Sequence, residues 1–236
     1  RRAACAATCR PAGARDRTIA AAGSRVRGAP RGPAAMLAIL SPAKLMNPEP
    51  SRLAISSTPM FAPRADELSA HLAKLSAQGL RDKLQISDSL AKENKQRYAQ
   101  WAHGVSQPQP GDAGFHAAAT LFNGPAYVGL DASSLTEEEL GFAQEHVRLL
   151  SGIYGVLRPA DLIQKYRLCM GTKDIAYSGH KTLYQFWGTS VTEHIVNHLM
   201  GMPTLSDGNR VLLNVASDVR HARLPHPLPP DARPGR

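Results

Sequence analysis

Short apolar runs alternate with amphipathic segments from Met36 onward, and this alternation restricts the fold more than any other feature of the sequence. The run MLAILS at 36–41 ends at a Ser-Pro pair and predicts a buried strand. The run VLLNV at 211–215 predicts another buried strand. Strands that alternate with helices are typical of an α/β or mixed α+β domain, which is the fold class that we expect.

The segments between these two runs follow helical or extended patterns. Caps and glycines mark several of their ends. The predicted elements are a helix over 64–77 closed by Gly79, a helix over 87–101 capped by Ser87 or Asp88, short strands AATLF and AYVGL around Asn123, a helix from Thr136 to about Leu150, a short helix PADLIQKY, and a long helix over 180–200 with Gly188 inside it.

The net charge of +9 belongs to the two ends of the chain. Residues 1–35 carry eight arginines and one acid, and residues 219–236 carry four arginines and one acid. The 16 basic and 17 acidic side chains of 36–218 leave that part at −1, so the overall charge does not by itself indicate a polyanionic partner for the folded part. We interpret 1–35 as a transit peptide or as translated upstream sequence before a start at Met36. The proline-rich segment 219–236 is interpreted as a non-native tail or a linker.

The stretch LSGIYGVLRP at 150–159 is the strongest local signal for a binding site. Gly152 fits a helix C-cap, and Gly155 allows a second sharp turn after Tyr154. Together they predict helix, hairpin, helix, with backbone N–H groups turned outward beside Arg158. A plain structural turn is the alternative interpretation.

Basic residues cluster around this hairpin. Residues 148–181 contain six bases and two acids, whereas 131–145 contain five acids and no base. A hairpin with a basic flank is typical of proteins that grip the phosphates of duplex DNA without reading sequence. Solvated surface cations are the alternative. The six bases are Arg148, Arg158, Lys165, Arg167, Lys173 and Lys181.

Two further patterns suggest chemistry. Ser41 and Lys44 follow the first strand and could position a phosphate or activate a nucleophile, although the glycines of a P-loop are absent. A turn with a surface lysine is the alternative. His194 and His198 share one helix face, but the order of Glu193 and His194 is not that of a zinc protease, and chance surface histidines are favoured. The three cysteines have no zinc spacing, so we predict no metal site and no cofactor.

Four segments together resemble the YaaA peroxide-stress protein family: MLAILSPAK at 36–44, FAQEHVRLLSGIYGVLRPADLIQKYRLCMG at 142–171, TLYQFWG at 182–188 and LLNVASD at 212–218. The resemblance implies a single mixed α/β domain of unusual topology, with a helix-hairpin-helix element and a basic cleft that binds DNA. It implies a cytoplasmic protein that limits iron-dependent damage under hydrogen peroxide. A plastid or mitochondrial location applies if 1–35 is a transit peptide.

The resemblance also implies a further lysine- and arginine-rich portion after 212–218, where this sequence has its proline-rich tail. We therefore expect a truncated domain over 36–218, with the 211–215 strand uncovered and solubility poor. The leading hypothesis is a monomeric protective protein that binds duplex or damaged DNA independently of sequence, with no membrane partner. The alternative is an enzyme that processes nucleotides or nucleic acids with Ser41 and Lys44. Direct iron handling ranks last, because no ligand cluster is visible.

Overall fold

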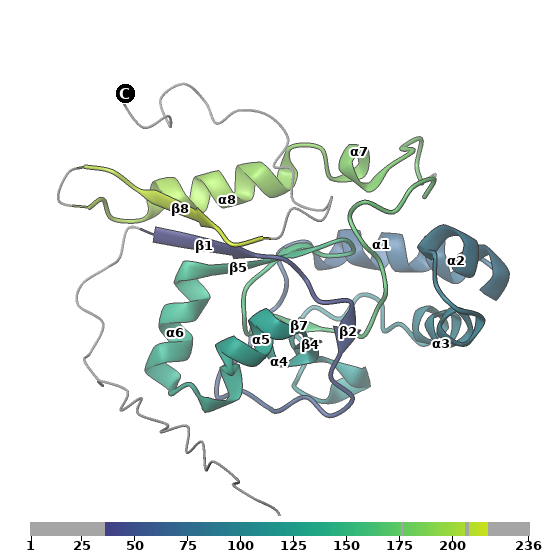
Figure 1. Ribbon diagram of the computed structural model, residues 1–236, viewed down its shortest axis with the longest axis horizontal. Helices are drawn as coiled ribbons and strands as arrows, with labels where there is room; N and C mark the ends of the chain where they lie inside the picture. The colour runs from purple at the N-terminus through teal and green to yellow at the C-terminus, as the bar shows by residue number, and fades with distance from the viewer. Residues whose placement is uncertain (1–35, 176, 206–207, 217–236) are drawn as a thin grey trace, which may run out of the picture. The chain divides into compact units, whose positions relative to one another are not determined.

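The computed structural model describes residues 36–216, apart from 176 and 206–207 (Figure 1). The predicted extension 1–35 and tail 219–236 lie outside the described residues. Within this part the chain forms a mixed α/β fold, as the sequence predicts. None of its described helices is both long enough and apolar enough to cross a bilayer.

A four-stranded sheet of order β6-β5-β1-β8 is the centre of the fold. The strands are β1 (Met36–Leu40), β5 (Val147–Ser151), β6 (Gly155–Leu157) and β8 (Val211–Asn214). Strand β1 runs parallel to β5 and to β8, whereas β5 and β6 are antiparallel. The two predicted strands at the ends of the domain are therefore neighbours, with Leu37 opposite Leu212.

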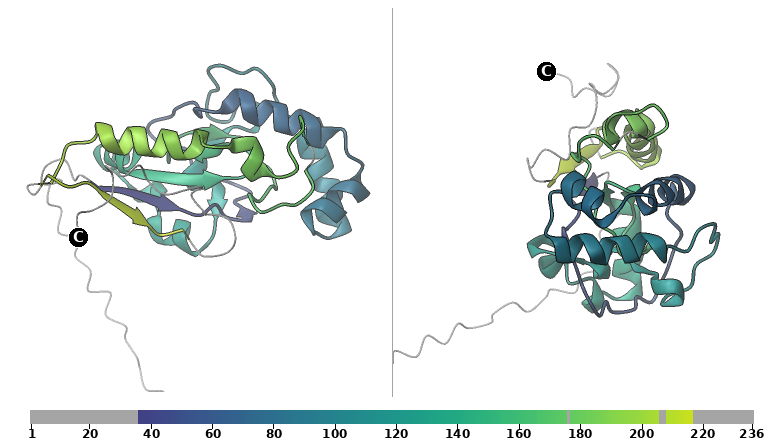
Figure 2. Two further views of the ribbon diagram at one scale, coloured as in Figure 1. Left: turned by 90° about the horizontal axis from the view of Figure 1, so that it is seen from above. Right: turned by 90° about the vertical axis from the view of Figure 1, so that its right-hand side faces the viewer.

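Helices cover both faces of this sheet (Figures 1 and 2). Helix α6 (Glu137–His146) lies on one face and α8 (Ser190–Gly201) on the other. The predicted start of α6 is confirmed by a capping box, in which Thr136 Oγ1 accepts from the Glu139 N–H at 3.2 Å and Glu139 Oε2 accepts from the Thr136 N–H at 2.8 Å.

Three helices form a separate group beside the sheet (Figure 1). They are α1 (Ala62–Ala73), α2 (Ala77–Leu84) and α3 (Asp88–Ala99). The sequence predicts one helix over 64–77 that Gly79 closes. Instead the chain breaks before Ser76, whose hydroxyl accepts from the Gly79 N–H and caps α2, so Gly79 lies inside a helix.

Short elements fill the connections. Two of the predicted strands are wrong in part: AATLF is mostly helical, and AYVGL is a helix behind Pro125, which suits a first helical turn. The elements are β2 (Leu45–Met46) paired with β4 (Phe122–Asn123), β3 (His116–Ala117) paired with β7 (Leu162–Ile163), α4 (Ala118–Leu121), α5 (Pro125–Leu130), α7 (Leu183–Trp187) and the 3-10 turns η1 (Asp112–Gly114) and η2 (Ala132–Ser134).

The predicted helix-hairpin-helix is a β-hairpin. Helix α6 ends at His146, and the segment 147–151 pairs with β1 instead of continuing the helix. The predicted helix PADLIQKY is also absent, because Leu162 donates its N–H to Ser57 O and its segment pairs with β3. Strand pairing thus outweighs the helical spacing of the sequence on both sides of the turn.

The turn needs its two glycines for reasons other than a helix cap. A Cβ at Gly152 would lie 2.4 Å from Leu168 O, so the backbone approach admits only glycine. Gly155 has a φ of 71° and packs against Trp187. The Tyr154 N–H donates to Ser151 Oγ at 3.0 Å, which closes the turn internally.

The predicted long helix over 180–200 is two helices. Gly188 breaks it with a φ of 51° and a ψ of −128°, and α8 begins at Ser190. Trp187 is buried, and its Nε1 donates to Gly152 O at 3.1 Å. Helix α7 is therefore attached to the β-hairpin, and α8 begins as a separate helix.

Strand β8 has the position predicted for it but is not buried. Val211, Leu213 and Val215 point to one side and are 39%, 46% and 58% exposed. Leu212 points to the other side and packs against the core. Among the described residues, β8 pairs only with β1, so its outer edge forms no strand ladder.

Candidate anion-binding site

The glycines of the hairpin do not present donors at the surface. Gly152, Tyr154 and Gly155 are all buried, and the Tyr154 hydroxyl accepts from the Gln164 N–H at 3.0 Å. These three residues belong to the core, whereas the sequence placed them on a phosphate-binding surface. Their role is to let β5, β6 and the Leu168 segment approach closely.

The six predicted cations separate into three groups. Lys165 and Arg167 lie beside β2, where Arg167 Nη1 donates to Lys44 O at 2.9 Å and Lys165 Nζ donates to Pro48 O at 3.1 Å. Lys173 and Lys181 are exposed between β7 and α7. Arg148 and Arg158 line a common pocket.

Ser41 and Lys44 follow β1, as predicted, but neither lines that pocket. The Ser41 carbonyl accepts from the Tyr127 hydroxyl at 2.7 Å, and the Lys44 side chain is exposed. The structure brings Lys44 together with Arg167, which the sequence had placed in the basic cluster.

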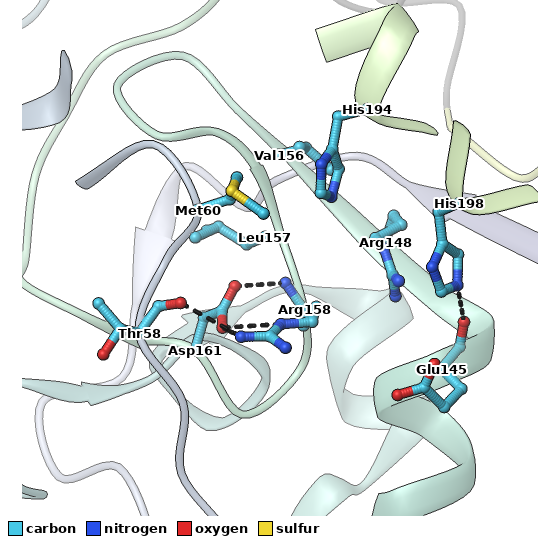
Figure 3. A pocket seen from close by; sticks show the side chains of 10 residues that line it. All are labelled: Thr58, Met60, Glu145, Arg148, Val156, Leu157, Arg158, Asp161, His194 and His198. Carbon is cyan, nitrogen blue, oxygen red and sulfur yellow. Dashed lines mark hydrogen bonds and ion pairs between the residues drawn. The ribbon is translucent and has the colours of Figure 1, made fainter. Parts of the chain in front are cut away.

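The pocket has a volume of about 340 Å³ and opens beside the β-hairpin (Figure 3). It forms where the loop before α1, the end of α6, the hairpin and α8 meet. Figure 3 shows Arg148 between Arg158 and two histidines. The lining residues are Thr58, Met60, Glu145, Arg148, Val156, Leu157, Arg158, Asp161, His194 and His198.

Arg148 is the most unusual of these residues, because it is only 2% exposed. Strand β6 pairs with 149–151 but does not extend to Arg148, which leaves room for the Arg148 side chain. Its Nη1 donates to Gln144 O at 2.6 Å and to Val147 O at 2.8 Å, but its buried Nε has no partner among the residues described. Burial lowers its pKa to about 10, so it remains a cation at neutral pH.

Arg158 is held in place by Asp161. The carboxylate accepts from Arg158 Nε at 3.1 Å, from Nη2 at 3.0 Å and from its backbone N–H at 2.8 Å, and it also accepts from Ser57 Oγ at 2.6 Å. Asp161 is 1% exposed, and burial raises its pKa despite the opposing effect of Arg158. These donors occupy both of its oxygens, so Asp161 orients Arg158.

Two histidines of α8 complete the pocket, although the sequence favoured chance surface positions for them. His198 Nε2 is 2.7 Å from Glu145 O, and the His194 ring meets the Phe61 ring edge-on at 5.8 Å. Burial, and next the charge of Arg148, lower the pKa of His194. Their spacing of four residues was the only signal for this shared position. Glu193, which precedes them, is exposed.

The pocket therefore presents two guanidinium groups, two imidazoles and the carboxylates of Glu145 and Asp161, of which Asp161 already accepts from Arg158 and Ser57. The two guanidinium groups can donate to an anion, and charge-assisted bonds from arginine to phosphate or carboxylate are stronger than neutral ones. In the part of the chain that the structure covers, no three His, Cys, Asp or Glu side chains gather as a metal site would require.

Known proteins resemble this chain in sequence. Residues 36–222 match the family model described as peroxide stress protein YaaA. A UPF0246 protein of Burkholderia multivorans is 44% identical over 183 residues, which are 77% of this chain and 67% of the relative. A UPF0246 protein of Cupriavidus pinatubonensis is 40% identical over 211 residues, or 85% of this chain and 78% of the relative.

Proposed function

This chain belongs to the family of the peroxide stress protein YaaA, and we propose that it protects DNA under peroxide stress by binding the phosphates of the DNA. The family supplies the link to peroxide stress. The DNA partner is the proposal, and it rests on the chemistry of the pocket and of the surface around it.

The observation that carries the proposal is the exposed arginine at the pocket. Asp161 fixes the fork of Arg158 at the mouth, where the Arg158 side chain remains 38% exposed. Arg148 lines the same pocket but is buried. Arginine forks match the geometry of phosphate oxygens and are common where proteins recognise phosphate.

A second group of cations supports a longer contact. Lys165 and Arg167 bond the backbone on either side of β2, at Pro48 and at Lys44, and none of these three cations lines the pocket. Their side chains would neutralise neighbouring phosphates without reading bases, so we expect binding that depends on salt and little on sequence.

Protection from iron follows indirectly in this proposal. The described residues offer no cluster of metal ligands, so the protein acts by covering DNA against radicals that iron and peroxide generate. The alternative enzyme with Ser41 and Lys44 gains no specific support, since these residues lie outside the pocket.

The test is the affinity of the full chain for a blunt duplex over a series of salt concentrations. The double variant Arg158→Gln, Arg167→Gln is expected to bind at least about tenfold more weakly at low salt, with a slope of log affinity against log salt reduced by about 1 for each lost phosphate contact. The matched control is Arg97→Gln on α3, a cation paired with Glu93.

Equal affinities for the wild type and the double variant would overturn the proposed role of these arginines. Binding that does not weaken as salt rises would also contradict contact with phosphates.

A further inference from the structure

We propose that the pocket takes a terminal phosphate, a phosphate monoester, and therefore holds either the phosphorylated end of a DNA strand or a free nucleotide. This inference rests on the proposed function and narrows the ligand of the same site. It follows from three features of the pocket: its depth, the donors that line it and the unpaired Nε of Arg148.

Depth is the first argument. Arg148 is 2% exposed and lies at the floor of a cavity of about 340 Å³. A phosphate inside a duplex is joined to sugars on both sides, so it reaches only the rim, where Arg158 lies. A terminal phosphate is attached through one ester bond and can project inward as far as Arg148. Cavities of this volume bind small molecules in other proteins, so a nucleotide is a ligand of suitable size.

The number of donors is the second argument. A phosphate monoester offers three free oxygens, whereas an internal phosphodiester offers two. The pocket presents Arg148, Arg158, His194 and His198 together with the carboxylates of Glu145 and Asp161. The Asp161 oxygens already accept from Arg158 and Ser57. The donors that lie together therefore suit the three oxygens of the monoester better.

The unused donor is the third argument. The Arg148 Nε is buried and has no hydrogen-bond partner among the described residues, whereas its Nη1 bonds two carbonyls. Buried donors are rarely left unpaired in folded proteins, because water is lost without a replacement. A phosphate oxygen in the cavity would supply the missing acceptor, and no internal duplex phosphate could reach it.

This ligand class would direct the protein to broken DNA. Radical attack on a deoxyribose breaks the strand and leaves phosphate monoesters at its ends. A protein that recognises such an end would concentrate where peroxide damage has occurred.

The experiment compares two internally labelled duplexes of one sequence, one with a 5′-phosphate and one with a 5′-hydroxyl at the same end. The full chain is expected to bind the phosphorylated duplex at least about tenfold more tightly at fixed salt. Adenosine 5′-monophosphate should compete for the phosphorylated duplex, and adenosine should not. Competition at low concentration by the mononucleotide would identify the free nucleotide as the better ligand.

Two variants locate the effect. Arg148→Met keeps the volume of the side chain but removes the charge and Nε, and it should abolish the preference for the phosphorylated end. Arg167→Gln, at the other basic group, should weaken both duplexes equally. If Arg148→Met does not fold, His194→Gln is the second variant, with a smaller loss of preference expected.

The outcomes separate the two proposals. Equal, salt-dependent binding of both duplexes, without competition by the nucleotide, overturns the terminal-phosphate pocket and leaves the proposed DNA binding intact. Binding of adenosine 5′-monophosphate through Arg148 without binding of either duplex overturns the DNA function and supports the pocket. Absence of binding to all three ligands overturns both.

Discussion

At the scale of single residues, the fold depends on how Asp161 is paired. This buried carboxylate links the loop at Ser57, the backbone after β6 and the guanidinium of Arg158. It fixes a pocket residue and joins two segments that are more than a hundred residues apart in sequence. A change at Asp161 therefore affects stability and the site together.

Asp161→Asn is expected to destabilise the protein by about 2–4 kcal/mol. The amide keeps the shape but leaves the buried side of Arg158 without its opposite charge, and breaking a buried pair costs more than forming it gains. Urea unfolding measures the change. Glu93→Gln, in the exposed pair with Arg97, is the control and should cost no more than about 0.5 kcal/mol. Similar losses in the two variants would contradict the structural role of Asp161.

At the scale of elements, the β-hairpin is the part where sequence and structure differ most. The start of α6 was readable from Thr136, because a capping box is a local signal. Its end was not, since residues 147–151 become a strand only when β1 lies beside them. The same holds for Leu162, whose strand requires its distant partner β3. Tertiary pairing outweighed local propensity in both places.

The residues of the candidate site could be predicted only in part from the sequence. Arg148 and Arg158 belong to a basic cluster that the sequence shows directly. His194 was interpreted as a chance surface histidine, because no signal near it in the sequence predicts that α8 packs beside Arg148 at the start of β5. The three hairpin residues Gly152, Tyr154 and Gly155 were placed on the surface for the same reason: their burial depends on Leu168 and Trp187.

Gly152→Ala tests the close approach within the hairpin. The added methyl group would lie 2.4 Å from Leu168 O and 3.0 Å from Leu168 C, and backbone atoms cannot move aside as a side chain can. The expected loss is about 1–3 kcal/mol or more, measured by thermal and urea unfolding.

Gly141→Ala is the matched control for the hairpin substitution. Gly141 lies inside α6 with open space where its Cβ would be, so alanine should stabilise the helix by about 0.5–1 kcal/mol. A gain at both positions would show that the hairpin is looser than the structure indicates.

Strand β8 supports a prediction about solubility. Leu213 and Val215 are half exposed and lie next to an edge that no described strand covers, which favours association between copies. Leu213→Lys is expected to raise the concentration at which light scattering first detects aggregates, without a change in the melting temperature. Leu212→Lys, whose side chain packs against the core, should instead unfold the protein. Unchanged aggregation in Leu213→Lys would show that the exposed face is not the cause.

At the scale of the whole molecule, the pocket makes stability depend on pH. His194 faces Arg148 from β5, Arg158 and Asp161 from the segment after β6, His198 on its own helix and the ring of Phe61. Burial and three of these neighbours, Arg148, His198 and Arg158, lower its pKa, and Asp161 only partly opposes them. The His194 ring therefore takes up a proton at lower pH in the folded protein than in the unfolded chain, where its pKa is about 6.5.

The stability of the free protein is therefore expected to fall as pH is lowered through about 6.5, because protonation favours the unfolded chain. His116, whose pKa is also lowered by burial, acts in the same direction. Urea unfolding at constant ionic strength between about pH 8 and pH 5.5 measures the slope. His194→Gln should reduce that slope, and an identical slope in the variant would assign the effect to other groups.

The order of the strands in the sheet also determines when they can pair during synthesis of the chain. Strand β1 is made first, yet its neighbour β5 begins about 107 residues later and β8 about 171 residues later. At roughly 5–20 residues per second, a growing chain carries β1 for about 5–20 s before its first partner exists. Throughout that interval Leu37 and Ile39, which end among the most deeply buried residues, have no sheet to enter. The speed of the ribosome thus sets how long each new copy remains open to the wrong partner.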